Sequence, residues 1–133
     1  MMKGLSLAEL LLVVIIIGIL AVMALPSQGR HIEKNISREA EANLMVIYNA
    51  QKRYKLDNDA YYVCTPNCTI DSINENLTLS IADTYFNYSI FPYGDDGSGF
   101  IANATRKERE CRDKVMNITH LGGPVQKECP QWQ

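Results

Sequence analysis

Four cysteines are the side chains with the most distinctive chemistry in this 133-residue sequence: Cys64, Cys68, Cys111 and Cys129. Three residues lie between Cys64 and Cys68, so they lack the paired CxxC spacing of common zinc sites. An even number of cysteines in an exported domain favours disulfide bonds. Three pairings are possible. We expect Cys64 with Cys68 and Cys111 with Cys129, because neighbour pairing closes the shortest loops.

The remaining polar residues form no recognisable catalytic pattern. His31 and His120 lie far apart, and there is no phosphate-binding loop or Ser-His-Asp arrangement. The segment 95–99 (DDGSG) could offer oxygen ligands to calcium, but it lacks the spaced carboxylates of a full loop motif and favours a hairpin turn. We therefore predict no enzyme activity, no cofactor and no metal site.

The overall charge argues against a nucleic-acid partner. Thirteen Lys and Arg residues against fifteen Asp and Glu residues give a formal net charge of −2. Without a basic field, the chain has no general electrostatic attraction for a polyanion. No specific nucleic-acid partner is predicted.

An acidic residue, Glu9, interrupts the most apolar part of the chain. Between Leu5 and Leu25 the other polar residue is Ser6. A helix of this length spans about 30 Å, which is enough to cross a bilayer. Lys3 supplies a positive flank, so the short N-terminus is expected in the cytoplasm and the bulk of the chain outside. An ordinary signal peptide and a plain membrane anchor are the alternatives, although a plain anchor does not explain Glu9.

The N-terminal sequence MMKGLSLAELLLVVIIIGILAVMALP resembles the class III signal and N-terminal helix of type IV pilins and type II secretion pseudopilins. The resemblance implies cleavage by prepilin peptidase after Gly4, which makes Leu5 the new, N-methylated first residue. Glu9 is then the fifth residue after the cut. Gly18 and Pro26 interrupt the helix at the family's positions.

The same resemblance gives roles to the residues of this segment. The family usually has Phe where Leu5 stands and a branched aliphatic residue where Ala8 stands. Glu9 is expected to pair with the α-amino group of Leu5 between neighbouring subunits, which would set their register. The alternative for Glu9 is that it complements the positive N-terminus of its own helix. Gly18 and Pro26 predict a bend or local melting between them.

After Pro26 the spacing of apolar residues remains helical while the polarity rises. Residues three or four positions apart predict a helix that continues to about Leu56. The positions are Ile32, Ile36, Ala40, Leu44, Ile47 or Tyr48, Gln51 and Tyr54.

The pattern of the second half of the chain predicts a small β-sheet. Residues 85–91 and 99–105 alternate with strand period and flank a turn-rich segment, so they predict a hairpin, and residues 115–119 predict a third strand. The fold class is therefore α+β, with a long N-terminal α-helix packed on a small antiparallel β-sheet, as in pilins. A bond between Cys111 and Cys129 would resemble the C-terminal disulfide loop of many pilins and would leave the tail as an exposed surface.

Six Asn-x-Ser/Thr triplets begin at Asn35, Asn67, Asn76, Asn87, Asn103 and Asn117. Polar residues alternating along strands are one explanation for their number, and glycosylation is another. Both explanations remain open from the sequence.

These observations predict a leader peptide at 1–4, a hydrophobic transmembrane and assembly half of the helix at 5–29, and a globular domain at 30–133. The predicted function is a structural subunit of a type IV pilus used in adhesion, twitching motility or DNA uptake. Its expected partners are further copies of itself in a helical filament, prepilin peptidase and the inner-membrane assembly machinery. It would reside in the bacterial inner membrane before assembly and on the cell surface afterwards. The alternatives are a type II secretion pseudopilin and a monomeric, membrane-anchored periplasmic binding module.

Overall fold

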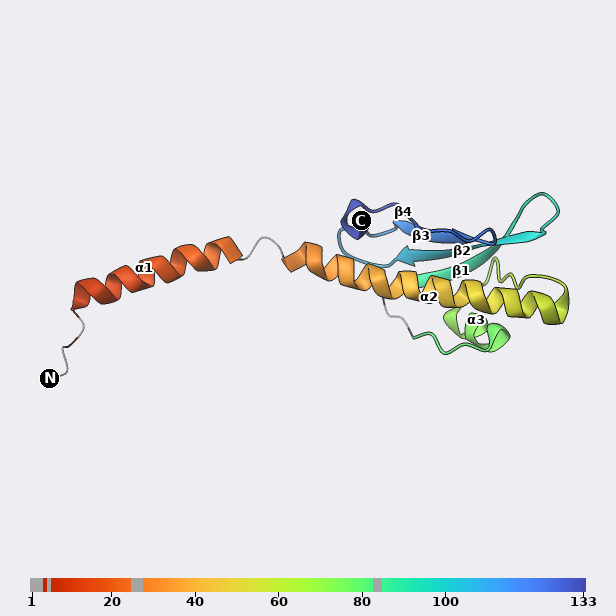
Figure 1. Cartoon of the computed structure of the whole chain (residues 1–133), viewed down its shortest axis with the longest axis horizontal. Helices are drawn as coiled ribbons and strands as arrows, with labels where there is room; N and C mark the ends of the chain where they lie inside the picture. The colour runs from red at the N-terminus through yellow and green to blue at the C-terminus, as the bar shows by residue number, and fades with distance from the viewer. Residues whose placement is uncertain (1–3, 5, 25–27, 83–84) are drawn as a thin grey trace. The chain divides into compact units, whose positions relative to one another are not determined.

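The computed structural model describes residue 4 and the ranges 6–24, 28–82 and 85–133 of the chain (Figure 1). They divide into two compact units, Met1–Ile32 and Glu33–Gln133, which are described separately below. The elements in chain order are α1 (Leu7–Ala24), α2 (Gln28–Asn58), α3 (Ile70–Leu77), β1 (Phe86–Tyr93), β2 (Gly99–Arg106), β3 (Val115–Thr119), β4 (Gln126–Lys127) and a short 3-10 helix, η1 (Pro130–Trp132).

The predicted N-terminal helical segment is present as α1 and α2. Pro26 lies in the range 25–27, outside the described residues, as does Leu5. Helix α1 is continuous from Gly18 to Ala24, so the local melting predicted as one possibility between Gly18 and Pro26 does not occur over these residues.

Among the residues that the structure describes, no helix is both long enough and apolar enough to cross a membrane.

From Glu33 onward, α2 packs one face into the core of the second unit. The buried positions recur every three or four residues, as helical geometry requires for one face. They are Glu33, Ser37, Ala40, Leu44, Ile47, Ala50 and Gln51. The helix ends at Asn58, two residues beyond the predicted end, and Asp59 follows with a positive φ of 58°.

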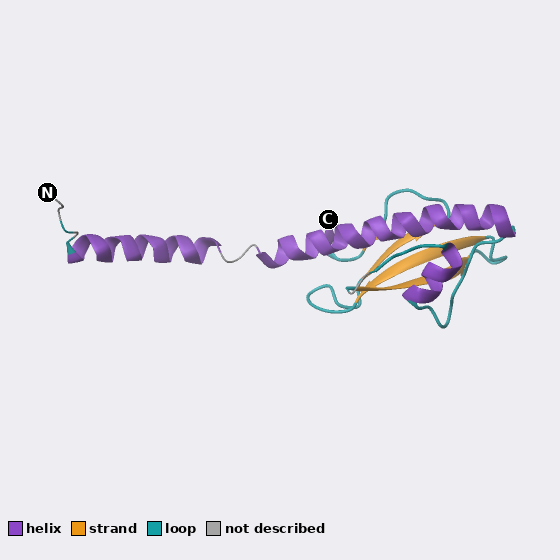
Figure 2. Ribbon diagram, turned by 90° about the horizontal axis from the view of Figure 1, so that it is seen from below, coloured by secondary structure: helices purple, strands orange, loops and turns teal. Residues whose placement is uncertain are grey.

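The sheet is antiparallel with the order β1-β2-β3-β4, and α2 lies along one of its faces (Figures 1 and 2). Ile90, Ala102 and Ile118 stand opposite one another on β1, β2 and β3, and all three are buried. The α+β fold, the hairpin and the third strand are confirmed. The two-residue β4 and α3 were not predicted, and α3 begins with a capping box between Thr69 and Ser72.

The C-terminal tail is only in part the exposed surface that the sequence predicted, since Pro130 and Gln133 are exposed but Trp132 is buried. Trp132 is 1% exposed, and its ring lies 5.7 Å from that of Phe86. The Lys127 ammonium group donates to the Trp132 carbonyl, and that of Lys34 on α2 donates to the Gln133 carbonyl. Trp132 is buried because enclosing its indole ring removes a large apolar area from water.

A buried ion pair joins α2 to β2. The Arg106 guanidinium donates to both carboxylate oxygens of Glu33, at 2.9 and 3.3 Å, and to the Tyr85 carbonyl at 3.1 Å. The two charged side chains are 1% and 3% exposed. The guanidinium also lies over the Tyr85 and Phe86 rings. The forked geometry satisfies charges that would be costly to bury alone.

We expect Arg106→Met to destabilise the fold by about 3–5 kcal/mol, because it leaves the Glu33 carboxylate buried without its cation. Replacing both residues, as Glu33→Leu with Arg106→Met, should recover most of that loss. Urea unfolding of the full chain in detergent measures both.

The matched control is Glu41→Gln, which removes the charge from the pair between Lys127 and Glu41 at 2.7 Å and leaves the contact of Lys127 with the Trp132 carbonyl. Those side chains are 20% and 37% exposed, so the loss should stay below about 1 kcal/mol. A double variant as unstable as Arg106→Met alone would contradict the role assigned to the buried charge.

Candidate assembly site

Helix α1 is apolar around its whole circumference. All of its large apolar side chains described here are exposed within the chain, from 49% at Val13 to 84% at Leu7. They are Leu7, Leu10, Leu11, Leu12, Val13, Val14, Ile15, Ile16, Ile17, Ile19, Leu20, Val22 and Met23. A helix that is apolar on every side belongs in a lipid or protein environment. Burying each such side chain stabilises by about 1.5–3 kcal/mol relative to exposure in water.

Glu9 and Ser6 form a reciprocal cap at the start of α1. The Ser6 backbone N–H donates to the Glu9 carboxylate at 3.0 Å, and the Glu9 backbone N–H donates to the Ser6 hydroxyl at 3.3 Å. The pattern is the capping box, which satisfies two backbone donors that have no partner within the helix. Within one chain, Glu9 therefore acts on its own helix N-terminus. The Ser-x-x-Glu spacing of residues 6–9 is the sequence signature of this cap.

The other predicted assembly residues fall in different places. Gly4 is exposed, and a Cβ added there would meet nothing within 4 Å, so its backbone is open to approach. Gly18 lies inside α1, and it also has open space where a Cβ would be. The predicted processing residue Leu5 and the predicted helix-interrupting residue Pro26 lie outside the described residues. The structure thus places Gly4, Glu9 and Gly18 in or beside α1.

The cysteines form the two disulfides of the neighbour pairing, Cys64 with Cys68 and Cys111 with Cys129. The first closes a short loop against the edge of the sheet. The Cys64 backbone N–H donates to the Ile90 carbonyl at 3.1 Å, and the Ile90 N–H donates to Cys68 Sγ at 3.4 Å. This loop therefore occupies the middle of the outer edge of β1.

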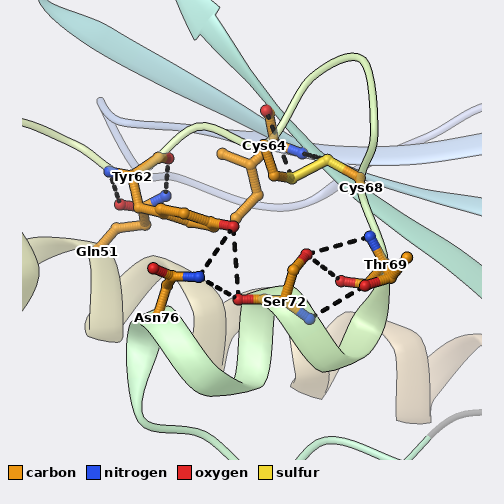
Figure 3. The surroundings of a disulfide bond; sticks show 8 residues. Gln51, Tyr62, Cys64, Cys68, Thr69, Ser72 and Asn76 are labelled. Atoms are coloured by element: carbon orange, nitrogen blue, oxygen red, sulfur yellow. Dashed lines mark hydrogen bonds between the residues drawn. A yellow bond between two sulfur atoms is a disulfide. The ribbon is translucent and has the colours of Figure 1, made fainter.

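Figure 3 shows how the Cys64–Cys68 loop is tied to two helices. The buried Gln51 side chain of α2 donates to the Tyr62 carbonyl at 2.7 Å and accepts from the Tyr62 N–H at 2.9 Å. The Tyr62 hydroxyl contacts α3, where it accepts from Asn76 at 3.3 Å and donates to the Ser72 carbonyl at 3.4 Å. A glutamine on the buried face of α2 thus provides the backbone partners that this segment would otherwise lack.

The second disulfide, between Cys111 and Cys129, fastens the C-terminal tail. Both cysteines are buried, at 0% and 2% exposure. The bond joins the connection before β3 to the residue before η1, so it holds the buried Trp132 near its pocket.

The acidic turn between β1 and β2 is a hairpin turn, as predicted. Gly94 and Gly97 adopt positive φ values of 89° and 65°, which favour glycine. The pKa of the Asp96 carboxyl is lowered, chiefly by a hydrogen bond from the Ser98 hydroxyl. The Ser98 backbone N–H, which donates to Asp96 Oδ1 at 3.0 Å, is the second cause. The carboxylate therefore takes its hydrogen bonds from within the turn.

Three of the six Asn-x-Ser/Thr triplets lie on β1, β2 and β3, and their side chains share the sheet face that α2 does not cover. The residues of each triplet are two apart, so strand geometry places Asn and Ser/Thr on the same face. Ser89, Asn103 and Asn117 stand directly opposite one another across the three strands. Strand alternation thus explains these three triplets.

We predict that the two disulfides contribute unequally to stability. In the chain-entropy model, Cys111→Ala with Cys129→Ala should cost about 3 kcal/mol and Cys64→Ala with Cys68→Ala about 2 kcal/mol, because the first pair closes the longer loop. The sequence separations are 18 and 4 residues. Chemical unfolding of each double variant, beside the oxidised parent, measures the difference. A larger loss for the short loop would show that its contacts with Ile90 outweigh chain entropy.

Comparisons with known proteins find relatives of two kinds. The chain is 35% identical over 77 residues to the type II secretion system core protein G of Escherichia coli (strain K12), covering 58% of this chain and 52% of that protein. It is 41% identical over 59 residues to the type IV major pilin protein PilA of Myxococcus xanthus (strain DK1622), covering 44% and 27%. It is 36% identical over 59 residues to the type II secretion system core protein G of Aeromonas hydrophila, covering 44% and 41%.

These matches are partial. The chain spans between about a quarter and a half of the length of the relatives it matches. No family model matches the chain, and no solved structure matches it significantly.

Proposed function

Because the chain belongs to the type IV pilin and type II secretion pseudopilin family, we propose that it is a subunit of a type IV pilus, polymerised through α1. As a member of this family it is a structural protein rather than an enzyme. The pilus would serve adhesion, twitching motility or DNA uptake.

The exposure of α1 carries this proposal. On the described residues of α1 alone, an isolated chain would present thirteen large apolar side chains to water, all at least 49% exposed. Packing α1 against the same helix of further copies removes this surface from water without any change in the globular unit. Before assembly, the inner membrane would cover the same surface, with the apolar sequence from Leu5 to Leu25 as the membrane segment.

Glu9 supplies the register of the filament in this proposal. Cleavage after Gly4 by prepilin peptidase would create a positive, N-methylated α-amino group on Leu5. In a bundle of α1 helices, this amino group and the Glu9 carboxylate of a neighbour could pair. Such a pair adds little net stability, but a misaligned subunit would leave one charge buried alone at a cost of about 3–5 kcal/mol. The inner-membrane assembly machinery would add subunits in that register.

The C-terminal disulfide favours a pilus over a secretion pseudopilus. Many pilins have a comparable disulfide loop near the C-terminus, and Cys111 and Cys129 close one here. The pseudopilus is the second candidate, because two of the relatives are core proteins of type II secretion.

The mass of the N-terminus tests processing. In protein purified from cells that contain prepilin peptidase, we expect the chain to begin at Leu5, with an added methyl group. Gly4→Val is the matched control, because a side chain at the cleaved bond should leave Met1–Gly4 attached. Sheared filaments made of chains that still begin at Met1 would contradict the proposal.

Two substitutions at the α1 cap separate the charge of Glu9 from its capping role. Glu9→Gln removes the charge but keeps the cap, since Gln serves equally at this position of a capping box. Ser6→Ala removes the cap, at a cost of about 1 kcal/mol, and keeps the charge. We expect Glu9→Gln to abolish sheared surface filaments and Ser6→Ala to retain them.

The measurement is the amount of disulfide-bonded subunit recovered in long filaments sheared from the cell surface. A normal filament yield from Glu9→Gln would contradict the role of Glu9 in setting the subunit register. It would favour the monomeric membrane-anchored module. Subunits found in the envelope and never in surface filaments would favour the pseudopilus.

A further inference from the structure

We propose that the β1 side of the uncovered sheet face is a saccharide-binding site, built from the neutral side chains of Asn87, Ser89, Asn103 and Thr105. The proposal concerns the isolated subunit and does not depend on filament assembly. It starts from a hollow of about 480 Å³ beside β1, which is within the range of small-molecule sites.

Two walls form this hollow. One consists of residues 86–89 of β1 with Thr105 of β2. The other consists of Pro66 and the segment 68–70, which begins at the disulfide-bonded Cys68 and reaches the first residue of α3. Lys107 is the charged lining residue. The disulfide loop therefore turns a flat sheet edge into a concave site.

The strand register places the four side chains at the corners of a rectangle. Asn87 stands opposite Thr105, and Ser89 stands opposite Asn103. Opposite residues on neighbouring strands are about 5 Å apart, and residues two apart along a strand are separated by about 7 Å. The rectangle has the dimensions of one sugar ring with its hydroxyl groups.

One atom of the rectangle already requires a partner. Asn103 Oδ1 is buried and accepts no hydrogen bond from the described residues. Buried acceptors are nearly always satisfied in native proteins, by protein, water or ligand. Asn103 does not line the hollow and this oxygen is closed to solvent, so a ligand hydroxyl supplies the missing donor only when the Asn103 side chain turns toward Ser89.

The chemistry of the lining favours a polyol. Each Asn offers two donors and one acceptor, and each hydroxyl both donates and accepts, so the rectangle matches a molecule whose groups do the same. Phe91 follows Ser89 on the same face of β1 and is 39% exposed, so its ring is available to pack on the apolar face of a sugar. Lys107 at the side would accommodate an acidic sugar.

A peptide strand is a poorer occupant. Strand addition needs consecutive backbone groups on the outer edge of β1. At Ile90, the N–H already donates to Cys68 Sγ, and the carbonyl already accepts from the Cys64 N–H. The disulfide loop thus interrupts the edge that an added strand would use.

The test measures binding of the purified full chain to an array of neutral hexose, N-acetylhexosamine and uronic-acid oligosaccharides. The detergent should be a polyoxyethylene type, since a sugar headgroup would compete. We expect saturable binding to at least one oligosaccharide, weakened at least tenfold by Asn103→Val and by Asn87→Ala. The matched control is Asn49→Ala on the exposed face of α2, which should bind as the parent does.

Asn103→Val also separates a binding role from a structural one. Valine suits a strand and has no acceptor to satisfy, so the melting temperature should stay level or rise while binding falls. Lys107→Gln identifies the ligand class: it should reduce binding of an acidic oligosaccharide and leave that of a neutral one unchanged.

The proposal is overturned if the parent chain retains no oligosaccharide, or if Asn103→Val binds as tightly as the parent. It is also overturned if the parent forms a concentration-dependent dimer that Asn103→Val dissociates, without binding any oligosaccharide. In that case a second copy occupies the face.

Discussion

The buried pair between Glu33 and Arg106 is the interaction on which the globular unit most depends. It lies where α2 enters this unit and joins that helix to the end of β2. The guanidinium also reaches the Tyr85 carbonyl beside β1, so one side chain fixes the positions of three segments. A buried charge tolerates few alternatives, because any shift of α2 along the sheet separates it from its partner. Leu44, Ile47 and Ile90 then fill the core between α2 and the sheet, whose relative register the ion pair already sets.

The two helices show how the same residue types serve two purposes. On α2, apolar side chains occupy one face and are buried inside the subunit, while the other face is charged. On α1, apolar side chains occupy every face and are exposed. A helix of the first kind stabilises its own domain, and a helix of the second kind needs an environment from outside it. The proposed filament follows from this contrast, since further copies of α1 provide that environment.

The disulfides determine which surface the subunit presents. The Cys111–Cys129 bond and the buried Trp132 bring the C-terminus back onto the unit, so the tail contributes to the core. The Cys64–Cys68 loop occupies the edge of β1 and forms one wall of the hollow beside it. The polar face of the sheet stays outside the core. The same loop therefore protects the sheet edge from strand pairing and shapes the neighbouring site.

The sequence by itself determined the features that depend on neighbours along the chain. The apolar segment with Glu9, the helical spacing to the end of α2, the β1–β2 hairpin and the α+β class all follow from local periodicity and turn residues. Tertiary structure decided what depends on distant residues. Glu33 and Arg106 are 73 positions apart, so nothing local marks them as partners. Trp132 looked like part of an exposed tail because the ring it packs beside, that of Phe86, lies on β1, far away in the sequence. The rectangle of Asn87, Ser89, Asn103 and Thr105 exists only through strand register, since hydrogen bonding between strands, and not sequence spacing, sets which side chains stand together.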